Sequence, residues 1–301
     1  MFYKKIFFYL ILLTLLNATP LDIINSIRAK SGAAHLKYSQ KLALAARKHA
    51  IYVHKTQKLG HYEENFSPYF YGNAPWDRVV KAGFGTAVVI ENISFYEPDY
   101  KASIKKIMGT VYHRLAFLFL QADSIGYASV GHIYVYEMSN SKIAQLCKKH
   151  YKNAAMIIDQ VCPNSSDIIP ETLFKKAMNK IEKAAKAVVI YPYRNQTEVP
   201  VKGVEERPKF RYRRFGFPIT ITFNSSYYKR VSLKSFQLFQ GEKEVPGKIV
   251  DSVNDIHHKI RRGTYVFVPL NSLLHHKRYR VKVAAVVDGK LKIIKWSFKT
   301  R

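Results

Sequence analysis

The sequence is poor in cysteine and in acidic residues. Among 301 residues only Cys147 and Cys162 are cysteines, which excludes a disulfide-dense mini-protein and a zinc site built from cysteine alone. Twenty-one Asp and Glu stand against 49 Lys and Arg, so the formal charge is +28 at pH 7. This charge favours anionic partners such as nucleic acid, phospholipid headgroups or acidic envelope polymers. A lysine-rich composition that only maintains solubility is the alternative.

The chain also lacks the short motifs of several enzyme classes. It contains no HExxH and no GxSxG, and Gly83 and Gly85 are not followed by the third glycine of a GxGxxG motif.

Long apolar runs are absent except at the start of the chain. Residues 1–18 read MFYKKIFFYLILLTLLNA, with two lysines, the short apolar run Ile6–Leu16 and the small residue Ala18. This pattern predicts a signal peptide, and the run is too short to span a bilayer core of about 30 Å. A retained N-terminal anchor is the alternative. We expect a secreted or periplasmic mature chain without a transmembrane segment, and export argues against nucleic acid as a partner.

The two cysteines can form a disulfide in an oxidising compartment. Closing a loop of about 15 residues stabilises a fold by roughly 3 kcal/mol in the entropy model. We expect this bridge, with two unpaired buried thiols as the alternative.

The spacing of apolar residues changes along the chain and indicates an α+β protein. Residues 19–140 mix helical and strand patterns, including a strand at 88–95 and a helix from Asp99 or Tyr100 to about Leu118. Residues 141–186 form a lysine-rich linker region. From residue 187 to residue 301 apolar residues recur at every second position, which predicts strands, and Asp288-Gly289 indicates a hairpin. The strands predicted there span residues 188–191, 219–223, 236–239, 265–268, 279–287 and 291–298.

Three residues of the first domain are candidates for chemistry. His61 lies in the loop sequence LGHYEEN, and Glu91 lies in VVIENISF, where an unpaired carboxylate would be costly. His113 lies in GTVYHRLAFL and points away from the apolar stripe of its helix, unless the helix has already ended. His49, on an apolar helix face, is interpreted as structural. Sequence spacing does not bring the three candidates together, so independent polar residues are the alternative.

Six sequence blocks stand in order between residues 21 and 138. They are ARKHAIYV, LGHYEEN, GNAPWDRVVKAGF, VIENIS, IMGTVYHR and DSIGYAS. This order resembles the bacterial branch of the CAP superfamily, the cysteine-rich secretory, antigen-five and pathogenesis-related group that is also called SCP-like. The resemblance implies an α-β-α sandwich with an open cleft, in which two histidines and one or two acidic residues can hold a divalent ion.

The resemblance assigns the three candidates to that cleft. His61 matches the histidine of the family's Gly-His pair, Glu91 the glutamate before Asn, and His113 the histidine before Arg. Zinc suits two imidazoles and a carboxylate, with water completing the coordination. A bound zinc would lower the pKa of its water towards about 7, and Glu91 would then be the general base, with His61 and His113 orienting the ion or moving protons.

Other positions depart from the family pattern. The family's second glutamate has no clean counterpart, and Glu97 and Asp99 are the nearest candidates. Ile107, Val111 and Tyr112 replace the family's Trp, Pro and Gly. The missing glutamate weakens an expectation of catalysis more than one of metal or ligand binding.

The last 115 residues resemble a bacterial Ig-like module of the S-layer type. The matching pieces are VVIYPYRNQTEVPV, GFPITITFNSS, FQLF with GEKEVPGKIV, and YVFVPLNSLLHHKRYRVKVAAVVDGKLKIIKWSFKT. The resemblance implies an all-β sandwich that acts as a spacer or adhesion module. From residue 187 onward 24 Lys and Arg face 8 Asp and Glu, a charge of +16.

The sequence therefore favours an exported binding protein. We expect its cleft to take a divalent metal, zinc or another, or a small hydrophobic, lipid or envelope-derived ligand. The basic C-terminal module would dock on an acidic envelope surface. The alternative is a metal-assisted hydrolase of a peptide or ester that uses the same cleft.

Overall fold

The computed structural model describes residues 18–152, 155–210, 212 and 215–301. The predicted signal peptide, apart from Ala18, lies outside these residues. Among the residues described, no helix is long and apolar enough to cross a membrane.

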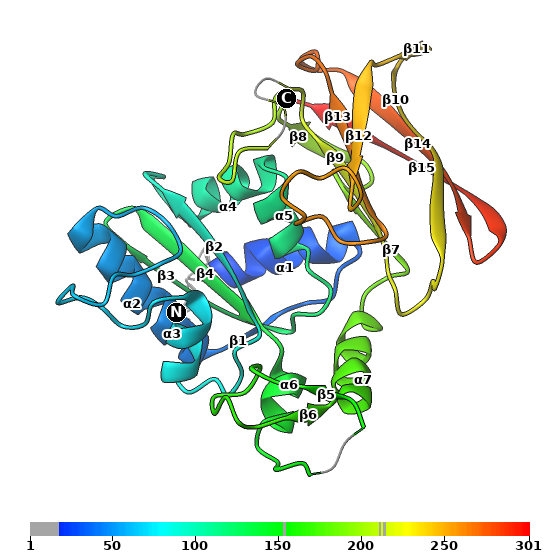
Figure 1. Ribbon diagram of the computed structural model, residues 1–301. Helices are drawn as coiled ribbons and strands as arrows, with labels where there is room; N and C mark the ends of the chain where they lie inside the picture. Colours follow the sequence, from blue (N-terminus) through cyan, green and yellow to red (C-terminus); the bar gives the residue numbers. More distant parts are fainter. Residues whose placement is uncertain (1–17, 153–154, 211, 213–214) are drawn as a thin grey trace, which may run out of the picture.

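The N-terminal part is a sheet covered by helices on both faces (Figure 1). Its elements are α1 (Pro20–Ser31), β1 (Lys37–Tyr38), α2 (Gln40–Thr56), α3 (Pro75–Lys81), β2 (Val89–Phe95), α4 (Tyr100–Gly109), α5 (Tyr112–Phe117), β3 (Ser124–Val130) and β4 (Ile133–Ser139). The strand order is β1-β3-β4-β2, with β1 parallel to β3 and the other pairs antiparallel. Strand β2 is therefore an edge strand.

The side chains of β4 alternate between the two faces of the sheet, and this explains why helices cover both faces. Ile133 and Val135 pack with α2, while Tyr134, Tyr136 and Met138 pack with α1, α4 and α5. Successive side chains of a strand point to opposite faces, so a strand that is apolar on both sides requires cover on both. The mixed helix and strand content and the α-β-α layering of this part confirm the predicted α+β class.

At the end of α1 the backbone of the N-terminal part lies close to the C-terminal part of the chain. Gly32 has φ 101°, and its N–H donates to the carbonyl of Arg28 at 2.9 Å. A Cβ at this position would lie 2.8 Å from the carbonyl oxygen of Val188. Glycine is thus needed here both for the left-handed backbone and for the close approach.

The prediction of one helix to about Leu118 was wrong, because the helix breaks at Thr110. Helix α4 ends at Gly109, Thr110 is extended, and α5 begins at Tyr112. The Thr110 hydroxyl donates to the carbonyl of Ile107 at 2.6 Å, which competes with continuation of the helix. Because His113 belongs to α5, its direction does not follow from the apolar face of α4.

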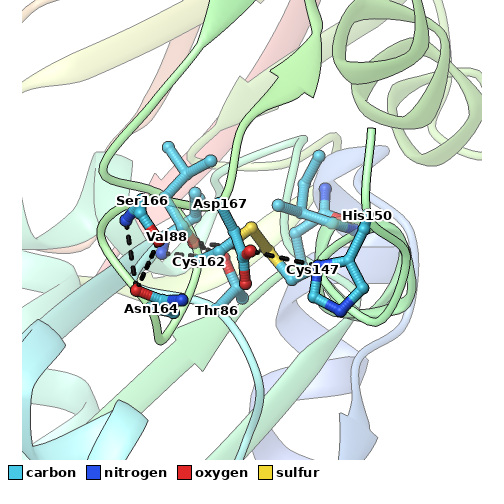
Figure 2. The surroundings of a disulfide bond; sticks show 11 residues. Thr86, Val88, Cys147, His150, Cys162, Asn164, Ser166 and Asp167 are labelled. Carbon is cyan, nitrogen blue, oxygen red and sulfur yellow. Dashed lines mark hydrogen bonds and ion pairs between the residues drawn. A yellow bond between two sulfur atoms is a disulfide. The ribbon is translucent and has the colours of Figure 1, made fainter. Parts of the chain in front are cut away.

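The junction is closed by an internal disulfide and joined to the N-terminal part by hydrogen bonds beside it. Its elements are α6 (Ser141–Leu146), β5 (Ile157–Ile158), β6 (Ile169–Pro170) and α7 (Glu171–Glu182). Cys147 and Cys162 are bonded at 2.07 Å, which confirms the expected bridge (Figure 2). Beside it, the carbonyl of Val161 accepts from the Thr86 hydroxyl at 2.6 Å and from the Ala87 N–H at 2.8 Å.

The C-terminal part consists of two sheets that share one apolar core. Its strands are β7 (Val188–Tyr191), β8 (Gln196–Val199), β9 (Ile219–Phe223), β10 (Val231–Gln240), β11 (Lys243–Glu244), β12 (Gly247–Asp251), β13 (Thr264–Pro269), β14 (Arg278–Val287) and β15 (Lys290–Thr300). The orders are β11-β10-β14-β15-β8 and β12-β13-β9-β7. Asp288 and Gly289 both have positive φ, as the predicted hairpin requires. The Ig-like assignment and the predicted domain boundaries stay predictions.

The apolar core is continuous from the N-terminal part into the C-terminal part. Ile107 and Phe117 belong to the same buried cluster as Val189, Val201 and Phe217. Arg114 reinforces this contact, because it donates to the carbonyl of Pro218 at 2.6 Å.

Removal of the disulfide tests its contribution to stability. We expect the Cys147→Ser/Cys162→Ser variant to lose about 3 kcal/mol of the free energy of unfolding, because the unfolded chain regains the entropy of a 15-residue loop. Urea denaturation of the two oxidised and purified proteins measures this. An unchanged midpoint would show that the packing of α6 and α7 holds the junction without the bond.

Candidate functional site

The floor of the site is a buried ion pair between Glu91 and Arg78. The Glu91 carboxylate comes from the edge strand β2, and Arg78 from α3 donates to it at 2.7 Å. The other carboxylate oxygen lies 2.7 Å from Nδ1 of His61. Both side chains of the ion pair are almost fully buried, so each offsets the cost of removing the other from water.

A second buried pair supports this floor. His49 lies 2.9 Å from a Glu63 oxygen through Nδ1 and 2.9 Å from the carbonyl of Gly60 through Nε2. Both partners are acceptors, so the ring donates from both nitrogens and carries a positive charge. The Glu63 carboxylate also accepts from the N–H of Tyr71 at 2.7 Å. The interpretation of His49 as a structural residue agrees with these contacts.

Glu137 is the third buried carboxyl group of the floor. It lies directly opposite Glu91 in the β2–β4 ladder, and its oxygens receive no hydrogen bond from the described residues. Burial, followed by the charge of Glu91, raises its pKa well above the ordinary value, which favours the neutral acid. The cluster then holds the cations Arg78 and His49, the anions Glu91 and Glu63, and a carboxyl group that resists ionisation.

The pKa of Glu91 moves in the opposite direction. Burial alone would raise it, but the charges of His49 and Arg78 and a hydrogen bond from His61 outweigh burial and hold the pKa well below its ordinary value. Glu91 is thus a permanent carboxylate with both oxygens engaged, and its side chain is 1% exposed. Its position therefore suits a role in orienting His61 and does not suit the role of a base that takes protons from a ligand.

His113 has a carboxylate partner that the sequence did not suggest. Its Nδ1 lies 2.9 Å from Glu206, a buried residue 93 positions later in the chain. Glu206 also accepts the backbone N–H groups of Val111 at 2.6 Å and Tyr112 at 2.9 Å. A carboxylate that accepts the free N–H groups at the start of a helix stabilises that end.

The segment that carries Glu206 is packed against the helix break. The Val204 N–H donates to the carbonyl of Gly109 at 2.9 Å, and a Cβ on Gly109 would lie 2.5 Å from the Val204 side chain. The Tyr112 hydroxyl donates to Asp255 at 2.6 Å, which adds a second link to the C-terminal part.

The two histidines lie next to each other at the edge of the sheet. Their ring centroids are 6.4 Å apart and their planes differ by 22°. His61 comes from the loop after α2 and His113 from α5, and both line an open cleft of about 500 Å³ beside β2. A carboxylate can only accept, so each Nδ1 carries a proton and each Nε2 of the neutral ring remains an acceptor. Glu91 does not line the cleft.

The donor set falls short of a metal centre. In the part of the chain that the structure describes, no three His, Cys, Asp or Glu side chains are grouped to hold a metal ion. Two Nε2 atoms are available, whereas Glu91 and Glu206 are engaged by other donors, and catalytic zinc sites use three protein ligands. We therefore derive no reaction step through a metal.

The nearest sequence candidates for a second acidic residue serve other roles. Glu97 pairs with Lys106 at 2.6 Å, and Asp99 accepts from the N–H of Ala102 at 2.7 Å as the cap of α4. Glu206 was missed because it lies outside the matched blocks. Glu137 carried a signal that was overlooked, since it interrupts the apolar strand IYVYEMS in the same way as Glu91 interrupts its own strand.

Glu137→Gln tests the buried neutral acid. The unfolded Glu137 ionises near pH 4.3 while the folded one keeps its proton, so its contribution to stability falls as pH rises above that value. Glutamine has no such loss, and we expect the stability of the variant relative to wild type to increase from pH 4 to pH 8. Urea denaturation across this range measures the difference. A difference that does not vary with pH would show that Glu137 is ionised in the folded protein.

Glu206→Ala tests the second carboxylate–imidazole pair. We expect His113 to leave the Nδ1–H tautomer and the free energy of unfolding to fall by about 1–3 kcal/mol, because helix N–H groups lose their acceptor. Nitrogen-15 NMR reports the tautomer. Glu205→Ala, an exposed neighbour, is the control. The same His113 tautomer in both variants would contradict the assignment.

Comparisons with known proteins identify a family for part of the chain. Residues 21–138 match the model of the CAP family, described as the cysteine-rich secretory protein family. No curated protein matches the chain.

Two solved structures are similar over part of the chain. One is an extracellular protein containing an SCP domain from Bacillus anthracis, with 20% identity and a TM-score of 0.37; the match covers 40% of this chain and 38% of that protein's length. The other is an outer surface protein of Borrelia burgdorferi, with 18% identity and a TM-score of 0.35; it covers 40% of this chain and 87% of that one. The match to the family model confirms the expected resemblance for the first part of the molecule: residues 21–138 are a CAP domain.

Proposed function

We propose that this is an exported protein whose CAP cleft binds a small amphiphile with hydroxyl groups, a negative charge and a short apolar chain. The observation that carries this proposal is the pair of imidazole rings, each held by a buried carboxylate, on one open cleft. Export is supported by the N-terminal pattern and by the Cys147–Cys162 disulfide, since such bonds persist in oxidising compartments.

The residues that line the cleft are the evidence for the apolar chain and the negative charge of this ligand. The apolar wall residues are Leu59, Ile93, Phe95, Ile107 and Val204. Lys106, Arg207 and Lys209 line the same cleft beside Glu205 and Glu206, and the remaining excess of positive charge favours an acidic group. A pocket with an apolar lining and a few polar groups is the usual form of a small-molecule site.

The histidines would recognise hydroxyl groups. Each fixed Nε2 accepts one O–H, so two neighbouring hydroxyls of a ligand fit two neighbouring rings. The buried carboxylates keep both rings in this tautomer before a ligand binds, which reduces the entropy lost on binding. Glu91 and Glu206 are positioning residues in this proposal.

The C-terminal part would hold the protein at its site of action. From residue 187 its excess of 16 positive charges favours docking on an acidic envelope surface. Such docking weakens as salt screens the charges over about 10 Å at 0.1 M.

Calorimetry with a short-chain lysophosphatidylglycerol, below its micelle concentration, tests the cleft. This probe has two headgroup hydroxyls, a phosphate and one acyl chain. We expect His61→Ala/His113→Ala to weaken binding at least about tenfold, because two hydrogen bonds of about 1 kcal/mol each are lost. The control is His35→Ala/His150→Ala, two exposed histidines elsewhere. Equal binding by the two double variants would overturn the proposed role of the rings.

A weak divalent metal site is the second candidate, and one observation favours it. Metal-binding histidines usually donate their other ring N–H to a carboxylate, as His61 and His113 both do. They would be the two ligands, whereas metal-assisted hydrolysis of a peptide or ester would need a third ligand that the described residues do not supply. Zinc calorimetry on wild type and His61→Ala/His113→Ala decides the matter, since identical isotherms would exclude this site. Turnover that survives in Glu91→Gln would remove Glu91 from any such reaction.

A further inference from the structure

The outward face of the sheet β10–β14–β15 carries cations at one end and exposed aliphatic side chains at the other. Along β14 the side chains of Tyr279, Val281 and Val283 are buried, so Arg278, Arg280 and Lys282 point outward. Figure 1 shows this sheet on the side of the C-terminal part away from the CAP domain.

Two pairs of cations on this face lie directly opposite each other. Lys282 pairs with Lys295, and Arg278 pairs with Lys299. Like charges directly opposite in an antiparallel ladder destabilise a sheet, and the two rungs are about 14 Å apart along the strands. The arrangement costs stability that an external anion would recover.

The neighbouring groups increase the positive charge. Arg194 and Arg280 line the same shallow groove of about 580 Å³ as Lys282 and Lys295. Among the described residues that line it, Glu242 is the sole carboxylate, and it contacts Arg280 at 3.0 Å. The groove therefore keeps a net positive charge.

The next rungs of the same face are apolar. Ala284 lies opposite Ile293, and Val286 lies opposite Leu291, close to the tip of the β14–β15 hairpin. Leu291 is 63% exposed and Ile293 is 55% exposed. Exposed aliphatic side chains that form one patch with cations are typical of surfaces that bind membranes.

We propose that this face docks on a lipid bilayer that contains anionic phospholipids. Lys282, Lys295, Arg278 and Lys299 would contact lipid phosphates, while Leu291 and Ile293 enter the interface between headgroups and acyl chains. A soluble polyanion would satisfy the cations but leave the aliphatic end in water, which is why a bilayer fits better. This inference rests on the docking part of the proposed function and is independent of the CAP cleft.

Co-sedimentation of the full chain with phosphatidylcholine vesicles, with and without phosphatidylglycerol, tests the proposal. We expect binding only to the anionic vesicles. Lys282→Gln/Lys295→Gln should weaken it by on the order of 30-fold, given about 1 kcal/mol for each cation near an anionic surface. Leu291→Ser/Ile293→Ser should weaken it at least about tenfold through lost apolar burial.

Two controls distinguish binding by this face from an effect of net charge and from binding by the CAP cleft. Lys101→Gln/Lys105→Gln removes two exposed lysines of the CAP domain and should leave vesicle binding within about twofold of wild type. His61→Ala/His113→Ala should leave it unchanged, and thermal unfolding of each variant confirms that it is folded. Equal loss in the two lysine variants would overturn the proposal in favour of net charge alone. Binding to isolated envelope polymer, but not to anionic vesicles, would overturn the lipid partner and leave the docking function standing.

Discussion

The site depends on keeping one carboxylate charged in a place without water. Glu91 stays ionised because Arg78 and the doubly protonated His49 face it, and because the raised pKa of Glu137 opposite favours the neutral form of that residue. A buried charge that loses its partner costs several kcal/mol, so these residues form one electrostatic unit. The orientation of His61 follows from that unit, since its Nδ1 has a fixed acceptor. Buried residues that do not line the cleft thus determine which nitrogen of His61 faces it.

The opposite wall is built by a different part of the chain. The break between α4 and α5 exposes backbone N–H groups at Val111 and Tyr112, and Glu206 both satisfies them and fixes His113. One carboxylate therefore stabilises a helix start and orients a ring. The two rings are held symmetrically, although one acceptor belongs to the CAP domain and the other to the segment that follows it. A CAP domain without this segment would lack half of the arrangement.

The sequence predicted the parts of the molecule that depend on local patterns. The motifs around His61 and Glu91 led to the CAP layers, and alternation with Asp288-Gly289 led to the β14–β15 hairpin. The helix break was missed because apolar periodicity continues through Thr110, while the hydrogen bond that ends α4 leaves no periodic signal. Glu206 could not be predicted, because its contact spans 93 residues and nothing in the sequence next to it identifies His113 as a partner.

The close approach at Gly32 and the shared core have a consequence for ligand entry. Domains joined by a flexible linker and a small polar interface usually move relative to one another, and a ligand can enter when they separate. Here Ile107 and Phe117 are buried together with Val201 and Phe217, so separation would expose a continuous apolar surface to water. Hinge opening is therefore disfavoured, and a ligand would reach the open cleft directly from solvent without separation of the two parts.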